Sequence, residues 1–282
     1  MHFDDSLPLV AVSANQDVRK TMAMLKRVLN LAETRTRWFL QSRELRHVAD
    51  MTQFEDYVAR TQPKEFLRYR AMSSSKRTEF RAVVDAMGVG LKGLRFLDVG
   101  PAYGDALDIC HEEGAEIVSF VEIDPVFFAY NSLKPYANGV RLNHLLGFNA
   151  LRPQTYDLIW VKGSIKADSF ELLDRAAHFM ARWLRGLETL AAPSCQILIC
   201  PYWDSSGGER AVDNVHGSPF STAMRSCGYS ALAPIRHHND DVAYPITFHK
   251  EMSRPAAAWA TAHPGRGLAA GNAQPSPEAG CS

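Results

Sequence analysis

The chain reads RFLDVGPAYG at residues 95–104, and this stretch decides the predicted fold. Its apolar residues Phe96, Leu97 and Val99 are typical of a strand buried inside a sheet. Gly100 and Gly104 follow, and glycine takes the backbone angles of a tight turn more easily than other residues. The stretch therefore predicts a buried strand that ends in a glycine turn and continues as a helix.

An acidic residue follows about 20 residues after this turn. Glu122 ends the apolar run from Ile117 to Val121, which predicts a second buried strand. In α/β proteins the N–H groups of a glycine turn approach a bound nucleotide, and an acid after the second strand accepts hydrogen bonds from ribose hydroxyls. Turn and acid together predict a site for a cofactor that contains ribose.

The spacing of the glycines narrows the class of cofactor. A dinucleotide-binding turn has the pattern Gly-x-Gly-x-x-Gly, whereas residues 101–103 separate Gly100 from Gly104 here. Asp98 precedes the first glycine, and its carboxylate would repel a diphosphate. A carboxylate suits a cofactor with a cationic amino-acid end. A nicotinamide or flavin site remains an alternative.

With these features the chain resembles the class I S-adenosylmethionine-dependent methyltransferases over roughly residues 92–250. The family's first motif is acid-x-Gly-x-Gly-x-Gly, matched by Asp98, Gly100 and Gly104, with Ala102 in place of the middle glycine. That alanine leaves the backbone slightly less free to approach the ligand. The resemblance implies an α/β fold: a doubly wound, seven-stranded, mostly parallel sheet whose last strand runs antiparallel. The third to seventh strands are then expected at residues 142–146, 156–161, 196–200, 232–237 and 242–248.

The same resemblance assigns cofactor contacts. Glu122 would bind the ribose, and Ile123 would lie against the adenine. Tyr103, in the glycine turn, would lie over the methionine moiety unless it only packs the turn. Where the family often has Gly-Asp-Ala after the third strand, this chain has GFNA at residues 147–150, and the asparagine amide oxygen can meet the adenine amino group. Lys162, which ends the fourth strand, would meet the cofactor carboxylate or the substrate, unless it is solvated. The predicted cofactor-binding residues are Asp98, Gly100, Pro101, Ala102, Tyr103, Gly104, Glu122, Ile123, Phe148, Asn149 and Lys162.

Methyl transfer from a sulfonium is a direct displacement, so the protein mainly aligns the reactants and excludes water. A base is needed only if the methylated atom must lose a proton. His216, in the loop predicted after the fifth strand, is the candidate base, because a neutral imidazole can accept a proton. Capping of the next helix and exposure to water are the alternatives for this histidine.

The preferred acceptor is an oxygen or nitrogen atom of a small-molecule substrate, and no metal is predicted. Enzymes that methylate exocyclic amino groups of bases carry Asn/Asp-Pro-Pro-Tyr after the fourth strand, whereas this chain has VKGS at residues 161–164. The carboxylate pattern of metal-dependent catechol methyltransferases is also absent from the sequence. Three alternatives stay open: methylation of RNA or a protein, a cofactor-binding protein without turnover, and a nicotinamide-dependent oxidoreductase.

Residues 15–88 are predicted to be helical. Phe80 begins an apolar stripe at helical spacing, and Thr52 with Glu55 predicts a capping box that opens a short helix. The serines at residues 73–75 predict a break. We expect this block to cap the cofactor end of the sheet. The predicted organisation is a helical N-terminal cap at 1–90, an S-adenosylmethionine-binding methyltransferase domain at 91–252, and a disordered tail, rich in Ala, Gly and Pro, at 253–282.

The N-terminal block carries an excess of positive charge. Between Val18 and Arg46, eight basic side chains oppose two acidic ones, although the formal net charge of the whole chain is 0. Such a strip attracts an acidic partner, such as RNA, a carrier protein or a phosphorylated substrate, unless it is only a solvated helix face. Trp38 and Phe39 are expected in the core or in a dimer contact, so a homodimer stays open.

The composition, 46% hydrophobic and 22% charged, is that of a soluble globular protein. The five cysteines lack the spacing of a metal site. The N-terminus lacks the basic start and apolar run of a signal peptide, and no apolar stretch reaches about 18 residues. We therefore expect a cytoplasmic protein without membrane contact, whose partner is a small molecule rather than nucleic acid.

Overall fold

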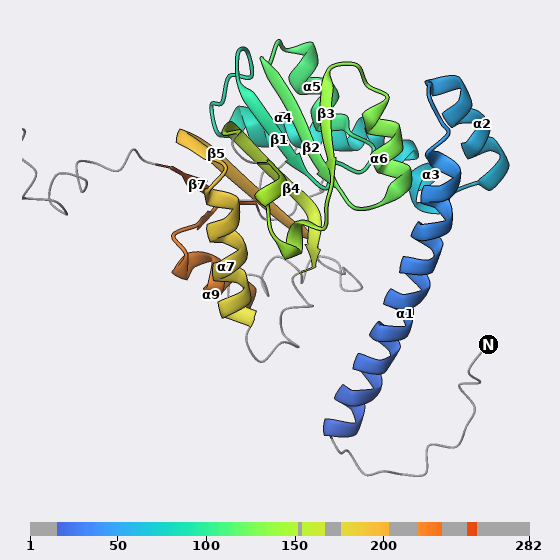
Figure 1. Ribbon diagram of the computed structural model, residues 1–282. Coiled ribbons are helices and arrows are strands. Elements are labelled where there is room, and N and C mark those ends of the chain that lie inside the picture. The colour runs from blue at the N-terminus through green and yellow to red at the C-terminus, as the bar shows by residue number, and fades with distance from the viewer. Residues whose placement is uncertain (1–15, 152–153, 167–175, 203–218, 233–246, 253–282) are drawn as a thin grey trace, which may run out of the picture.

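The computed structural model describes residues 16–151, 154–166, 176–202, 219–232 and 247–252. Its strands are β1 (Arg95–Val99), β2 (Ile117–Glu122), β3 (Ala137–Arg141), β4 (Tyr156–Lys166), β5 (Ala191–Tyr202), β6 (Ser230–Ala231) and β7 (Phe248–Glu251). They form one sheet in the order β3-β2-β1-β4-β5-β7-β6 (Figure 1). The five neighbouring strands β3, β2, β1, β4 and β5 run parallel to one another. Strand β7 runs antiparallel to both of its neighbours, β5 and β6. The predicted doubly wound α/β fold with seven mostly parallel strands is therefore confirmed.

Helices cover both faces of this sheet. Ile159, Trp183 and Met224 belong to the apolar core between the sheet and helices α7 and α9, and Phe80 and Phe96 belong to the core under α4 and α5 on the other face. Apolar side chains on both faces explain why the central strands are continuous hydrophobic runs. The helices are α1 (Gln16–Leu45), α2 (Met51–Thr61), α3 (Lys64–Ala71), α4 (Ser73–Ala86), α5 (Asp105–Glu112), α6 (Pro125–Ser132), α7 (Ala176–Glu188) and α9 (Pro219–Ser226).

The block before β1 is helical, as expected. Helices α2 and α3 pack against α6 through aromatic rings, among them Phe54, Phe66 and Tyr130, with ring centroids 5.2–5.5 Å apart. The long helix α1 extends away from the sheet, and only its C-terminal part meets α6 (Figure 1). Trp38 is partly buried there, whereas Phe39 is 64% exposed and is not in the core. The homodimer and the domain limits stay predictions.

The predicted third strand at residues 142–146 is wrong. Strand β3 lies earlier in the chain, and residues 144–146 form a short 3-10 helix, η1 (His144–Leu146). Because β3 is an edge strand with partly or fully exposed side chains, it lacks the apolar run by which strands were located. A methyl group on Gly139 would come 2.2 Å from the ring of Phe120, so this strand requires a glycine, which normally counts against a strand.

The predicted capping box at Thr52 and Glu55 is wrong by two positions. The carboxylate of Asp50 accepts a hydrogen bond from the N–H of Gln53 at 2.9 Å, and Gln53 Oε1 accepts one from the N–H of Ala49 at 2.9 Å. This reciprocal pair satisfies backbone donors at the start of α2, as a capping box does. The helix therefore exists where it was expected, but other residues begin it.

The break expected at residues 73–75 is a single residue, Met72. Helix α3 ends at Ala71 and α4 begins at Ser73, so the serines form the first turn of α4 instead of separating two helices. Serine is neutral to unfavourable only in helix interiors, and the first turn accommodates it. As a consequence, Lys76 and Glu79 lie on the same helix as the apolar stripe that packs on the sheet.

Several predictions lie outside the described residues. These are the candidate base His216, most of the predicted strands at 232–237 and 242–248, and the tail at 253–282. On the described side of this gap, β7 begins at Phe248, where the predicted strand was expected to end. None of the described helices is long and apolar enough to cross a membrane.

Candidate functional site

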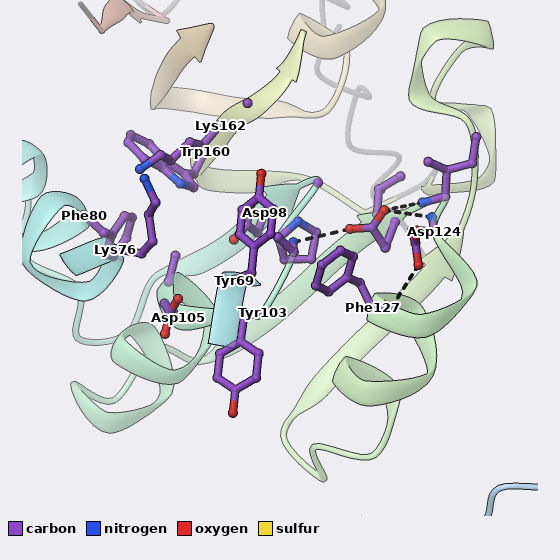
Figure 2. A pocket seen from close by; sticks show the side chains of 18 of the residues that line it. Tyr69, Lys76, Phe80, Asp98, Tyr103, Asp105, Asp124, Phe127, Trp160 and Lys162 are labelled. Atoms are coloured by element: carbon purple, nitrogen blue, oxygen red, sulfur yellow. Dashed lines mark hydrogen bonds between the residues drawn. The ribbon is translucent and has the colours of Figure 1, made fainter. Parts of the chain in front are cut away.

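A cavity of about 420 Å³ opens at the carboxyl ends of β1, β2 and β4 (Figure 2). Ligands of doubly wound sheets bind at this edge, and pockets for small molecules usually span about 300–1,000 Å³. Helices α3 and α4 supply part of the wall, together with the glycine turn after β1. The block before β1 therefore lines the cavity.

The glycine turn exposes the backbone of Ala102 to the cavity in a fixed position. Ala102 has a φ of +50°, in the left-handed region that is unfavourable for residues with a side chain. Its N–H donates to Glu122 Oε2 at 3.3 Å, and its carbonyl oxygen accepts from Asn131 Nδ2 at 2.8 Å. Hydrogen bonds on both sides of this residue offset the cost of its conformation.

Helix α6 and the residues just after it hold the turn from behind. Lys134 is 7% exposed, and its Nζ donates to the carbonyl oxygens of Tyr103 at 3.4 Å and Gly104 at 3.2 Å, and to Asp108 at 2.6 Å. Gly104 has a φ of +80°, and a methyl group there would come 2.0 Å from Asn131 Oδ1. Gly104 therefore serves the packing of the turn against these side chains, and it does not line the cavity.

Two buried carboxylates lie beside the turn. Asp98 is 2% exposed and Glu122 is 7% exposed. Glu122 Oε1 accepts from the backbone N–H groups of Ile123 at 2.7 Å and Asp124 at 2.9 Å. Asp98 Oδ1, in contrast, has no hydrogen-bond partner among the residues that the structure describes. The site therefore contains a buried acceptor that the rest of the described protein leaves unsatisfied.

Burial is the main cause that raises the pKa of both carboxyl groups. Burial, with a further contribution from the charge of Glu122, raises the pKa of Asp98 well above its ordinary value. Burial also raises the pKa of Glu122 to about 7, although the hydrogen bonds that its carboxylate accepts from backbone N–H groups partly counteract this shift. A cation bound beside these carboxyl groups would favour their ionised forms.

Aromatic side chains from the helices form another part of the wall. The rings of Tyr69 and Phe127 meet edge to face, with their centroids 5.5 Å apart. The indole N–H of Trp38 donates to Asp124 Oδ2 at 3.0 Å, while Asp124 Oδ1 accepts from the N–H of Val126 at 2.8 Å and caps α6. Aromatic rings from α1, α3 and α6 thus line this side of the cavity.

Basic side chains lie on the other side of Asp98 from Asp124 (Figure 2). Lys76 of α4 places its Nζ 3.3 Å from Glu79 Oε2, and Lys162 of β4 pairs with the same oxygen. Both lysines line the cavity, whereas the buried Glu79 lies behind them. The cavity is therefore acidic at one end and basic at the other.

The structure brings most of the predicted cofactor-binding residues together. Residues 100–103 line the cavity with Asp98, Glu122, Ile123 and Lys162. Gly104, Phe148 and Asn149 do not line it. Phe148 is 3% exposed and packs on Trp183, with ring centroids 6.0 Å apart, and Asn149 is exposed at the start of the 3-10 helix η2 (Asn149–Leu151). This placement follows from the earlier position of β3, which changes the path of the chain after it.

Sequence reasoning missed His144 and Lys76 as residues that line the cavity. His144 Nδ1 accepts from Trp183 Nε1 at 3.2 Å, so the neutral imidazole carries its proton on Nε2. The sequence offered one signal for Lys76: Glu79 follows three residues later on a helix, so the two side chains are neighbours and can form an ion pair. Within the described ranges, no three His, Cys, Asp or Glu side chains are placed to hold a metal ion.

Comparison with known proteins finds similar folds. No family model matches the sequence, and no curated protein matches it either. A TehB-like SAM-dependent methyltransferase from Corynebacterium glutamicum is 15% identical over 72% of this chain and 99% of that chain, with a TM-score of 0.45. An O-methyltransferase family protein from Burkholderia thailandensis is 13% identical over 71% and 63%, with a TM-score of 0.46. The N-methyltransferase NodS from Bradyrhizobium japonicum is 12% identical over 68% and 99%, with a TM-score of 0.42.

Proposed function

We propose that this protein is an S-adenosylmethionine-dependent methyltransferase that acts on an oxygen or nitrogen atom of a small molecule without a metal. The observation that carries the proposal is the pair of buried carboxyl groups, Asp98 and Glu122, beside a glycine turn at the carboxyl edge of the sheet. A sulfonium cofactor with an amino-acid end is cationic where these groups are acidic.

The residues present fit this cofactor. The unsatisfied Oδ1 of Asp98 can accept a hydrogen bond from the ammonium group of the amino-acid end. Glu122 accepts three backbone hydrogen bonds, which leaves about one of its four lone-pair sites for a ribose hydroxyl. Ile123 lines the cavity next to Glu122, where an apolar side chain can contact the adenine.

The same residues do not fit a dinucleotide. A helix N-terminus attracts a diphosphate when it is free of acidic groups, because its N–H groups carry partial positive charge. Asp105 and Asp108 occupy the first turn of α5, and Asp98 lies beside the turn that precedes it. Asp108 is paired with Lys134, but Asp98 and Asp105 line the cavity at this helix start. Their carboxylates would repel a diphosphate, so a nicotinamide or flavin dinucleotide is disfavoured.

The chain contributes mainly position and the exclusion of water. S-adenosylmethionine, when bound, supplies an electrophilic methyl group on a cationic sulfur. Glu122 and Asp98 would fix the two ends of the cofactor, so that the acceptor meets the methyl group in one orientation. Tyr69 and Phe127 close the cavity and keep water away from the reacting atoms. The base, where the acceptor needs one, stays the prediction made for His216.

Calorimetry with S-adenosylhomocysteine and NAD tests the cofactor. We expect saturable binding of S-adenosylhomocysteine and no binding of NAD. A preference for NAD would contradict the proposal. Transfer of a tritiated methyl group from the cofactor to the small-molecule, RNA or protein fraction of a cell extract then tests the substrate class, and we expect the label in the small-molecule fraction.

Methylation of RNA is the second candidate, favoured by one observation. Arg35, Arg37 and Arg43 on α1 are exposed, so the basic strip is available to a phosphate backbone. Binding of this kind weakens steeply with salt, because counterions are released. Salt-dependent RNA binding that disappears when the three arginines are neutralised, together with label in the RNA fraction, would favour this candidate.

A further inference from the structure

The cluster of Lys76, Glu79 and Lys162 carries two positive charges and one negative charge. Glu79 is 3% exposed, and it is the carboxylate that both ammonium groups share. The lysine side chains are only 24% and 21% exposed. Burying an unpaired charge costs free energy, so buried charges are normally paired. Glu79 therefore shares one negative charge between two ammonium groups, and the charge of Lys162 also acts on the cavity carboxylate of Asp98.

The two ammonium groups also keep hydrogen-bond donors for a ligand. Each ammonium group has three N–H donors. Over the ranges of chain that the structure describes, Nζ of Lys162 has no hydrogen-bond partner besides the shared carboxylate of Glu79. Lys76 and Lys162 both line the cavity, whereas Glu79 does not. Nζ of Lys162 is buried, so a ligand would meet this cluster first at Lys76, whose side chain is 24% exposed.

The electrostatics of the pair point the same way. Burial opposes the charge of Lys76, but Glu79 outweighs this effect and raises the pKa of Lys76. Burial lowers the pKa of Lys162, and Glu79 offsets the shift only in part. An anion bound between the two groups would counteract the effect of burial on Lys162. Within this cluster, Glu79 does not fully offset the effect of burial on Lys162.

The charges divide the cavity between cofactor and acceptor. Asp98 and Glu122 form the acidic end, to which the proposed function assigns the cofactor. We propose that the basic end, formed by Lys76 and Lys162, binds a carboxylate or phosphate group of the acceptor molecule. This inference rests on the proposed function and names its substrate class: a small acidic molecule, held by its anionic group while its oxygen or nitrogen is methylated.

The test uses the full-length protein saturated with S-adenosylhomocysteine. The loaded protein is titrated with sodium benzoate or with inorganic phosphate, and binding is followed by NMR of the protein amides. We expect one of the two anions to bind saturably, which identifies the group as a carboxylate or a phosphate. Lys76→Met should weaken this binding roughly tenfold or more, the scale of losing a hydrogen bond to a charged group. Lys76→Arg should retain it.

Lys92→Met is the matched control, because Lys92 is an exposed lysine that does not line the cavity. Unchanged affinity of Lys76→Met for S-adenosylhomocysteine shows that the variant is folded. The inference is wrong if neither anion binds the loaded protein, or if Lys92→Met loses as much affinity as Lys76→Met. It is also wrong if the anions displace S-adenosylhomocysteine, since the lysines would then hold the cofactor's own carboxylate and the proposed function would survive. Failure of S-adenosylhomocysteine to bind at all would overturn both.

Discussion

The two ends of the cavity are built in different ways. At the acidic end, Asp98 stands on β1 and Glu122 ends the neighbouring strand β2, and backbone N–H groups hold the carboxylate of Glu122. At the basic end, Lys76 of α4 meets Lys162 of β4 through ion pairs between side chains. The acidic end thus arises from neighbouring strands and the turn after β1, whereas the basic end arises only because α4 packs on the sheet near β4.

This difference has a consequence for binding. Backbone groups of the turn are fixed by their own hydrogen bonds, so the acidic end is suited to one ligand with a constant shape. Lysine carries its charge on a flexible four-carbon stem, so the basic end can adjust to its ligand. The acidic end therefore suits the invariant cofactor, and the basic end suits an acceptor.

The largest loss of stability is expected from Gly104→Ala. This substitution tests whether contacts with Asn131 and Lys134 require a glycine in the turn at the acidic end. The new methyl group would come 2.0 Å from Asn131 Oδ1 and 2.7 Å from Lys134 Nζ, at a φ of +80°. Asn131 is fully buried, and its Nδ2 donates to two carbonyl oxygens, so moving it aside would break these hydrogen bonds. We expect the free energy of unfolding in urea to fall by about 3 kcal/mol, from strain and overpacking together.

Gly93→Ala is the control for the backbone conformation alone. Gly93 has a φ of +75°, but nothing lies within 4 Å of a methyl group added there. Only the left-handed conformation is penalised, at about 1 kcal/mol. Equal losses in the two variants would show that contacts with Asn131 and Lys134 are not what requires a glycine at residue 104.

The next effect concerns the cofactor. We expect Asp98→Ala and Glu122→Ala each to weaken the binding of S-adenosylhomocysteine by about 1–3 kcal/mol, because each removes a hydrogen bond to a charged group. Isothermal titration calorimetry measures this change. Asp85→Ala is the control, since Asp85 is exposed on α4 away from the cavity. Unchanged affinity in both cavity variants would refute the assignment of the acidic end.

Sequence reasoning predicted the acidic end because its information is local. Asp98, the two glycines and Glu122 follow from strand and turn patterns, and the parallel register of β1 and β2 then brings them to one edge. The seven-stranded sheet with an antiparallel last strand was expected from the resemblance to the methyltransferase family, not from local patterns. Local patterns located β1, β2, β4 and β5, and a doubly wound sheet places the carboxyl ends of its parallel strands side by side.

The basic end and the third strand were not predictable in this way. Lys76 reaches Lys162 only because α4 packs on the sheet, and no local pattern records that contact. Strand β3 has exposed residues and a glycine that is needed for its packing against Phe120, so its sequence lacks the signature of a buried strand. Phe148 was then assigned to the cofactor, although its ring lies in the core.

The pH dependence of cofactor affinity measures the contribution of one group at the acidic end, the carboxylate of Glu122. Burial raises the pKa of Glu122 to about 7. In the proposed site a ribose hydroxyl would donate a hydrogen bond to the ionised carboxylate. Protonation below this pKa therefore opposes binding, so affinity should fall as the pH decreases. Between pH 7 and pH 6 we expect the affinity for S-adenosylhomocysteine to fall about fivefold because of this group. Calorimetry at both pH values measures the change.

Glu122→Gln is the matched variant for this titration, because it keeps the shape of the side chain but cannot ionise. Any remaining pH dependence in Glu122→Gln belongs to other groups, among them Asp98, whose pKa is raised by burial. The difference between wild type and variant should therefore contain the contribution of Glu122 alone. Identical pH profiles would show that the carboxylate of Glu122 does not titrate in this range or does not touch the cofactor.

The smallest effect is expected at the opposite edge of the sheet, where Arg95 and Asp157 join the starts of β1 and β4 by bonds of 2.8–3.0 Å. Hydrogen bonds from Arg95 lower the pKa of Asp157, so the pair stabilises the fold above the ordinary carboxyl pKa and loses this effect as the pH falls through the lowered value. Because both side chains are about one-third exposed, Asp157→Asn should cost only roughly 0.5–1 kcal/mol of unfolding free energy near pH 7. Its affinity for S-adenosylhomocysteine should equal that of wild type, since neither residue lines the cavity. A loss of affinity in this variant would mean that the acidic end depends on the whole sheet, and the contrast between a locally encoded end and an assembled end would fail.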